Sequence, residues 1–200
     1  MMMTPRVRKL ALAAHITLSV GWIGAVAAYI ALDVSAATGQ DAQALRAAYL
    51  GMELIAWYVI VPLAFAALLT GLVMSLGTKW GLFEHYWVLI SLLLTIIATG
   101  VLLVETRTIS GFADRAADPS ASGDDLRALG GTLVHSVGGT LLLLVILVLN
   151  VYKPRGLTPY GWRKQREERA RSARRTSAAG RPEASRPALA AGRPDVSHGR

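Results

Sequence analysis

Four apolar stretches, each long enough to cross a lipid bilayer, dominate this sequence. They lie at about residues 10–32, 55–76, 87–104 and 132–151. At a rise of about 1.5 Å per residue, each forms a helix of roughly 27–35 Å, close to the thickness of the hydrocarbon core. Apolar runs of about 18 residues or more are typical of membrane spans rather than of a soluble core. The sequence therefore predicts an all-α membrane protein, with a four-transmembrane-helix antiparallel bundle over residues 10–152 and lipid as its surroundings.

The positions of the basic residues predict how these spans are oriented. Of the 21 Lys and Arg residues, 13 follow Tyr152, and Arg6, Arg8 and Lys9 precede the first span. Basic residues next to spans mark the cytoplasmic side of a membrane. Both termini, residues 1–9 and 153–200, are therefore expected in the cytoplasm of a multi-pass protein of the bacterial inner membrane. The first span also resembles a signal peptide, but some 23 apolar residues exceed a typical signal core, which favours a retained span.

The tail after residue 152 has a composition that cannot build a core. It is rich in Arg, Ala, Ser and Pro, with almost no large apolar residues after Trp162. Such a composition predicts a disordered, basic cytoplasmic segment over residues 153–200. The Arg clusters between Arg163 and Arg175 are expected to bind anionic lipid headgroups. Nucleic acid is not an expected partner, because no folded recognition element accompanies the charge.

The connections between the spans contain recognisable helix signals. Asp41 is a candidate N-cap for a helix that leads into the second span, and Pro62 is expected to kink that span. The short stretch from Gly77 to Tyr86 predicts an antiparallel hairpin of the second and third spans. The longest connection, residues 105–130, is polar and is expected to be a loop, with Ser122 to Asp125 capping the fourth helix.

His15 is the most informative polar residue within a span. It starts a stripe of polar or amphipathic side chains on one helix face, formed by His15, Ser19, Trp22, Tyr29 and Asp33. Ionisable residues inside a membrane are costly, which makes His15 a candidate site for haem, metal or proton transfer. The structural alternative is a hydrogen bond to a neighbouring helix, for which the hydroxyl ladder Ser91, Thr95 and Thr99 of the third span is a candidate partner.

Three further side chains are candidates for a site. Met74 is expected near the depth of His15, where its thioether could be a second haem ligand. Glu53 and His135 are expected in one layer near the other ends of their spans, as a pair for proton or ion transfer or as a hydrated interfacial pair. The chain has no cysteine, which excludes disulfides and thiolate chemistry, and no dedicated metal site is expected.

The first span also carries a family resemblance. The segment Leu10 to Tyr29, LALAAHITLSVGWIGAVAAY, has a His followed after six residues by Trp-x-Gly. It resembles the first span of bacterial membrane proteins related to copper-resistance protein D and to the J-type protoporphyrinogen oxidase. Together with GTKWGLFEHYWVLISLLLT, it looks most like a family of four-span bacterial membrane proteins of unknown function. The resemblance covers about 150 residues and implies haem binding by His15 or, through the copper-resistance proteins, copper uptake.

These observations leave three functions open, and no catalytic residue is identified. The first is haem b binding in a membrane redox system through His15. The second is a non-enzymatic accessory or scaffold protein, whose polar stripes hold the bundle to itself, to a membrane-protein partner or to further copies of the chain. The third is metal or ion transport along His15 and the Glu53–His135 pair.

Overall fold

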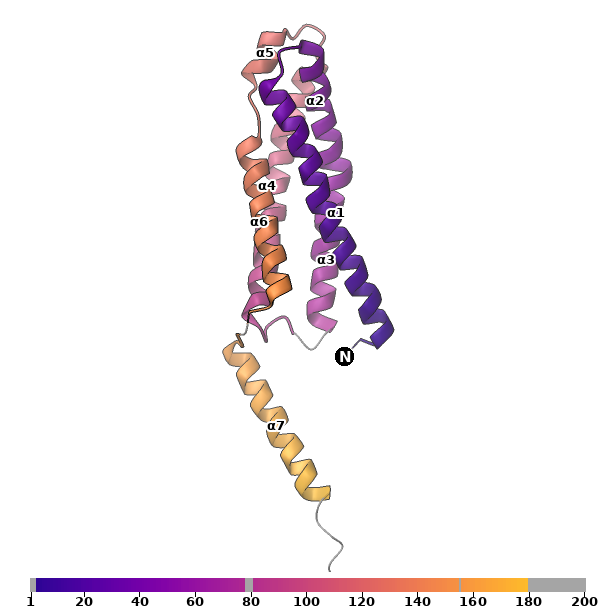
Figure 1. Cartoon of the computed structure of the whole chain (residues 1–200), viewed down its shortest axis with the longest axis vertical. Helices are drawn as coiled ribbons and strands as arrows, with labels where there is room; N and C mark the ends of the chain where they lie inside the picture. The colour runs from indigo at the N-terminus through magenta and orange to yellow at the C-terminus, as the bar shows by residue number, and fades with distance from the viewer. Residues whose placement is uncertain (1–2, 78–80, 155, 180–200) are drawn as a thin grey trace, which may run out of the picture. The chain divides into compact units, whose positions relative to one another are not determined.

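A computed structural model describes residues 3–77, 81–154 and 156–179 of the chain. Its helices, in chain order, are α1 (Pro5–Thr38), α2 (Ala42–Ile55), the π-helical turn η1 (Ala56–Ile60), α3 (Val61–Gly77), α4 (Tyr86–Ala117), α5 (Gly123–Ala128), α6 (Leu133–Tyr152) and α7 (Pro159–Ala179) (Figure 1). Because α2, η1 and α3 are continuous, four helical stretches are long and apolar enough to span a membrane. The predicted fold class, an all-α membrane bundle with four spans, is confirmed.

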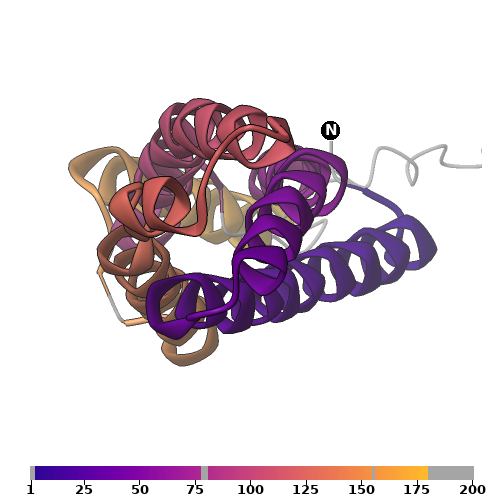
Figure 2. The ribbon, with the colours of Figure 1, turned by 90° about the horizontal axis from the view of Figure 1, so that it is seen from above.

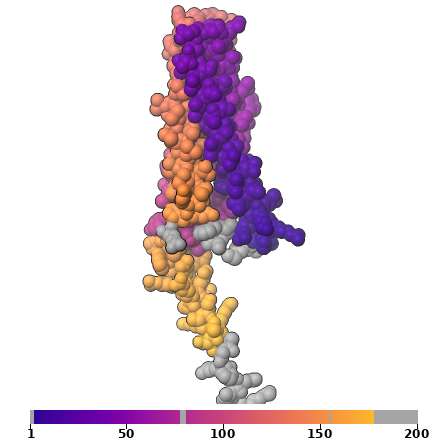
Figure 3. All heavy atoms as spheres, in the orientation of Figure 1, coloured from indigo at the N-terminus to yellow at the C-terminus, as the bar shows by residue number. Residues whose placement is uncertain are grey.

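The four long stretches pack as a ring. The α1 helix contacts α2 and α3, these contact α4, α4 contacts α6, and α6 returns to α1 (Figures 1 and 2). Figure 3 shows α1 and α6 next to each other on one face of this bundle. Successive long stretches run in opposite directions because each connection returns the chain along the bundle. The interior of the ring is therefore bounded by side chains from every long stretch.

The helices are longer than the predicted spans, mainly at the end of the bundle where α5 lies. The α1 helix continues to Thr38, and α4 continues past Val104 to Ala117. The predicted loop over residues 105–130 is therefore wrong for its first half. Its apolar positions Ile109, Ala113 and Ala116 recur at helical spacing and are buried. A helix that keeps one buried apolar stripe can continue along the chain beyond the point where its mean hydropathy is too low for a membrane span.

Both predicted caps form hydrogen bonds in the structure, and a π-helical turn precedes Pro62, where a kink was predicted. The Asp41 carboxylate accepts a hydrogen bond from the Ala44 backbone N–H at 2.8 Å, which confirms its capping role. Ser122 and Asp125 form a capping box, but it begins α5 rather than the fourth span, which starts separately at Leu133.

At Pro62, which has no N–H, the preceding turn is a π-helix in which Val61 N–H bonds to Ala56 O. The wider turn gives the proline ring room beside the previous turn of the helix.

The α7 helix occupies part of the segment for which the composition predicted disorder. Its first three residues belong to the unit that ends at Gly161, and the rest belongs to a separate unit. Arg, Glu, Gln and Ala are strong helix formers, and Glu167 and Arg171 are opposite charges at a spacing of four residues, which favours a helix. Side chains from Arg166 to Ser177 are exposed, in line with a segment that has no core of its own. Residues 180–200 of the predicted disordered tail lie outside the described residues.

The tightest packing lies where α2, α4 and α5 meet. We call this cluster the α5-end core, and it contains the largest fully buried apolar side chains: Tyr49, Leu45, Met52, Ile109 and Leu126. Thr106 and Asp33 are buried to the same degree. The opposite half of α1, before Trp22, has no buried residue among those described. The α5 end is therefore the part of the bundle that holds side chains in fixed positions.

Candidate functional site

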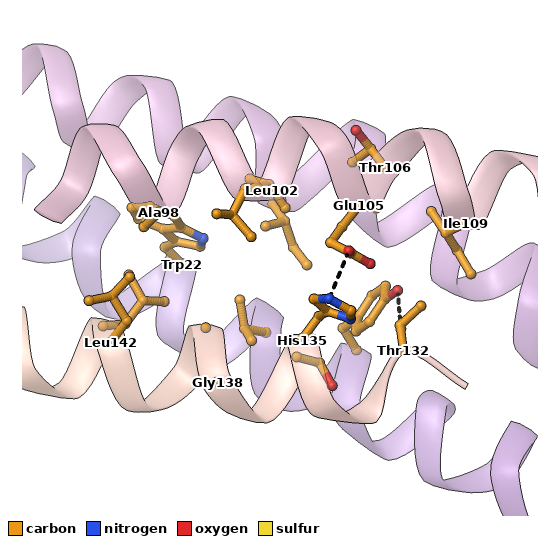
Figure 4. Close-up of a pocket in the computed structure, with 18 of the residues that line it drawn as sticks. Trp22, Ala98, Leu102, Glu105, Thr106, Ile109, Thr132, His135, Gly138 and Leu142 are labelled. Atoms are coloured by element: carbon orange, nitrogen blue, oxygen red, sulfur yellow. Dashed lines mark hydrogen bonds and ion pairs between the residues drawn. The ribbon is translucent and has the colours of Figure 1, made fainter. Parts of the chain in front are cut away.

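A cavity of about 320 Å³ that is half open to the surface of the bundle lies between α1, η1, α4 and α6 (Figure 4). Its walls come from α1, η1, α4 and α6, with the π-helical turn η1 contributing Ala56 and Ile60. Its apolar lining comprises Trp22, Val26, Ala56, Ile60, Ala98, Val101, Leu102, Ile109, Val134, Leu142 and Leu143. The polar lining residues are Tyr29, Glu105, Thr106, Thr132, His135 and Ser136. The cavity is therefore apolar along most of its length, with polar groups concentrated toward the α5 end.

Glu105 and His135 form the ionisable pair of this cavity. The His135 Nε2 and Glu105 Oε1 atoms are 3.5 Å apart, and the side chains point toward each other from α6 and α4 (Figure 4). His135 is 58% exposed, whereas Glu105 is only 20% exposed. The second carboxylate oxygen, Glu105 Oε2, is buried and accepts no hydrogen bond from the described residues. A buried carboxylate oxygen without a donor is costly, so this position is poorly explained by stability alone.

Beside this pair, Asp33 collects three hydrogen bonds from the start of α6. Its Oδ1 accepts from the Thr132 N–H, and its Oδ2 accepts from the Thr132 and Ser136 hydroxyls, each at 2.9 Å. Asp33 is fully buried, and no Lys, Arg or His side chain among the described residues forms an ion pair with it. The positive end of the α6 dipole and the three hydrogen-bond donors take the place of a basic ion-pair partner for Asp33. Asp33 therefore fixes the first turn of α6 to α1.

The direction of these hydrogen bonds can be assigned. Because the Thr132 hydroxyl donates its one proton to Asp33, it must accept from Tyr29, whose hydroxyl lies 2.9 Å away. The Tyr29 proton is thus directed at Thr132, the Thr132 proton at Asp33, and the Ser136 proton at Asp33 or at Leu133 O, 3.2 Å away. The hydroxyl protons of Tyr29, Thr132 and Ser136 are therefore directed at neighbouring protein atoms.

The α6 wall has free space. A Cβ atom added at Gly138 or Gly139, both of which line the cavity, would meet no atom within 4 Å. At the other end of the cavity, Trp22 projects inward, and its indole N–H makes no hydrogen bond to another described residue (Figure 4). Tyr29 is seven residues along α1 from Trp22, or about 10 Å, so the two ends are separated by roughly the length of a small organic molecule.

The structure places His15 outside this cavity. Its Nδ1 lies 3.0 Å from the Thr70 hydroxyl, and a Cβ at Gly71 would lie 3.1 Å from its ring. An interhelical hydrogen bond to a Ser or Thr of a neighbouring helix was one of the two interpretations of His15, and the observed partner is Thr70 of the second span rather than the candidate ladder of the third span. The Thr95 and Thr99 hydroxyls of the third span instead donate to carbonyls of their own helix.

The remaining sequence candidates do not assemble into one site. His135 lies against Glu105, not against Glu53, which is half-buried on α2 and does not line the cavity. Met74 is half-buried on α3, and the described contacts of His15 are with Thr70 and Gly71 instead. Of the polar stripe on α1, Trp22, Tyr29 and Asp33 are buried on one face. No group of three metal-ligating carboxylate or imidazole side chains occurs among residues 3–77, 81–154 and 156–179.

Glu105 is a residue of this candidate site that the sequence did not indicate, because it was assigned to a loop. Ala98, Leu102, Glu105 and Ile109 recur at helical spacing, so extending the third span by two turns would have placed Glu105 on its inner face. Comparisons with known proteins add no further residue. No protein-family model, no curated protein and no solved structure matches this chain.

Proposed function

We propose that this chain is an integral membrane protein that binds a small lipid-soluble molecule in the cavity between α1, η1, α4 and α6. The observation that carries the proposal is the apolar cavity of about 320 Å³ with an unpaired, buried carboxylate oxygen, Glu105 Oε2, in its wall. Pockets for small ligands begin at about 300 Å³ and combine apolar walls with a few polar groups. A bundle that served only as a scaffold would be more stable without a buried, unpaired carboxylate oxygen.

The cavity makes a binding role a better explanation than the predicted ion route. That route required Glu53 and His135 to share a layer, whereas His135 lies at Glu105 and Glu53 does not line the cavity. The cavity walls are also formed by side chains suited to organic matter rather than to a hydrated ion, because the larger part of the lining is aliphatic or aromatic. The ligand therefore has an apolar body that occupies most of the space and a polar group at the α5 end.

Filling the cavity at Gly138 should abolish binding. Gly138 and Gly100 are both exposed glycines with open space around an added Cβ, but Gly138 lines the cavity and Gly100 of α4 does not, so Gly138→Leu adds its isobutyl group at the cavity and Gly100→Leu adds the same group elsewhere. With 4-phenylbutan-1-ol as the probe, we expect Gly138→Leu to weaken binding about tenfold or more and Gly100→Leu to leave it within about twofold. The measurement is equilibrium dialysis against phosphatidylcholine nanodiscs, with protein-free nanodiscs subtracted. Equal affinity for the probe in the wild-type protein, Gly138→Leu and Gly100→Leu would show that the cavity is not the binding site.

Haem b binding through His15 is a second candidate, and one observation favours it. With the Thr70 hydroxyl donating to Ala66 O at 2.7 Å, it is free to accept from His15 in the tautomer that carries its proton on Nδ1. This tautomer leaves Nε2 with a free lone pair, the arrangement that metal-ligating histidines use, in which the other ring nitrogen donates to the protein. The resemblance of the first span to the J-type oxidase supplies the expected group. Haem bound here would supply one-electron redox chemistry, and Thr70 would orient the imidazole.

The haem candidate predicts a specific pair of variants. Protein purified from haem-replete cells should show a Soret band that is absent in His15→Ala. Thr70→Val, which removes only the acceptor for Nδ1–H, should weaken haem affinity by about 10- to 100-fold without abolishing it. Absorption spectra and haem titration measure both effects. Colourless wild-type protein, or a Soret band that survives His15→Ala, contradicts this candidate and leaves the cavity proposal untouched.

A further inference from the structure

We propose that the ligand of the cavity is an organic cation, an apolar molecule with a protonated amine that pairs with Glu105. This inference rests on the proposed function and names the chemical class of its ligand. The inference follows from the charged side chains at the polar end of the cavity and from the hydrogen-bonding atoms that are left without a partner there.

The charged groups at the polar end favour a positive ligand. Glu105 lies in the cavity wall, and Asp33 lies directly behind Thr132 and Ser136, which also line it. No Lys or Arg is among the described residues that line the cavity, and His135 is the single lining residue that can become cationic. His135 contacts one oxygen of Glu105 and is more than half exposed, so it neutralises one carboxylate at most. In a medium of low dielectric constant, this excess of negative groups attracts a cation and repels an anion.

The hydrogen-bonding groups at this end accept rather than donate. The hydroxyl protons of Tyr29 and Thr132 and the Thr132 N–H all point along the network that ends at Asp33. The ring nitrogen of His135 that faces the cavity is engaged by Glu105 Oε1. Apart from the second ring nitrogen of the exposed His135, what is left is the unpaired Glu105 Oε2 and the second lone pair of the Tyr29 oxygen. A ligand that brings donors satisfies these acceptors, whereas a carbonyl or a carboxylate at Glu105 Oε2 meets another acceptor.

The aromatic side chains suit the same ligand class. Trp22 and Tyr29 both line the cavity from α1, and the Figure 4 view shows Trp22 beside Ala98 at the end away from Glu105. Indole and phenol rings favour cations near their faces and also provide apolar surface for the body of the molecule. The ammonium group therefore belongs at Glu105 and the apolar body between Trp22 and Leu142.

Three probes on one carbon skeleton test this assignment: 4-phenylbutylamine, 4-phenylbutan-1-ol and 4-phenylbutyrate. They differ only in the polar end, which at neutral pH is an ammonium, a hydroxyl or a carboxylate. In phosphatidylcholine nanodiscs, we expect the amine to bind about tenfold more tightly than the alcohol, and the carboxylate to bind most weakly. Glu105→Gln should remove the advantage of the amine over the alcohol, because the glutamine side chain keeps a hydrogen-bond acceptor but carries no charge. Asp114→Asn, which removes an exposed carboxylate from the same helix, should keep that advantage.

The outcomes separate the two proposals. If amine and alcohol bind equally to the wild-type protein, or if Glu105→Gln keeps the advantage of the amine, the ligand is not a cation and the cavity remains a binding site. If no probe distinguishes the wild-type protein from Gly138→Leu, the cavity itself is not a site and both proposals fail. Retained, measurable binding of the alcohol by Glu105→Gln is also the evidence that this variant is folded.

Discussion

Replacing Asp33 with alanine is expected to lower the free energy of unfolding by about 3–5 kcal/mol. The substitution leaves three donors at the start of α6, the Thr132 N–H and the hydroxyls of Thr132 and Ser136, without their buried acceptor. Each unsatisfied buried group costs about 1–3 kcal/mol, and partial compensation by water at the end of the bundle keeps the sum below the maximum. Equilibrium unfolding in mixed detergent micelles, followed by circular dichroism, measures the loss.

Two further substitutions show whether this loss comes from the network. Asp33→Asn keeps one acceptor oxygen, so it should cost about 1–2 kcal/mol. In a Ser136→Ala background, one of the three donors is already absent, and Asp33→Ala should then cost less than it does alone. Strict additivity of Asp33→Ala and Ser136→Ala would contradict the hydrogen-bonded network. A loss below about 0.5 kcal/mol for Asp33→Ala, the range of ordinary surface changes, would show that Asp33 does not stabilise the fold.

The membrane spans could be predicted from the sequence because hydropathy over about 20 residues reports the cost of placing a helix in lipid. The same signal could not show where the helices end. In α4 the mean hydropathy falls after Val104, but the helix continues for 13 more residues, because Ile109, Ala113 and Ala116 still form a buried stripe. The polar face of this part of α4 can be hydrated by water. The position at which α4 ends is therefore determined by the packing of its buried stripe and not by the thickness of the lipid.

The candidate site was predictable only in part, and for a physical reason. His135, Tyr29 and Asp33 could be selected as costly or polar residues near spans, but their partners depend on which helices are neighbours. Thr70 on the second span and Thr95 on the third offer the same hydroxyl chemistry to His15, and the ring order of the helices decides between them. Glu105 was assigned to a loop, so its position opposite His135 could not be inferred. Because the third span was predicted to end too early, a residue of the candidate site was left out of the prediction.

Tyr49→Ala is the second large effect that we expect, a loss of about 3–5 kcal/mol in the free energy of unfolding. Tyr49 is fully buried in the α5-end core, and its ring meets Phe112 edge to face with centroids 5.7 Å apart. Truncation leaves a cavity among side chains that cannot collapse into it, and it removes the hydroxyl that donates to Gly130 O at 2.6 Å. Tyr58, which is 77% exposed on η1, is the matched control and should lose less than about 1 kcal/mol as Tyr58→Ala.

The variant Tyr49→Phe distinguishes the contribution of the Tyr49 ring to packing from the contribution of its hydroxyl to the placement of α6. It keeps the ring and removes the hydroxyl, so it should cost only about 1 kcal/mol in stability. The Tyr49 hydroxyl, however, bonds Gly130 O, two residues before Thr132, whose N–H and hydroxyl bind Asp33. Loss of this hydrogen bond releases the connection that sets the first turn of α6, and with it the placement of His135 against Glu105. Probe affinity should therefore fall in Tyr49→Phe by more than in Tyr58→Phe, measured by the same dialysis. Equal affinities in these two variants would mean that the α5-end core stabilises the bundle without positioning the cavity.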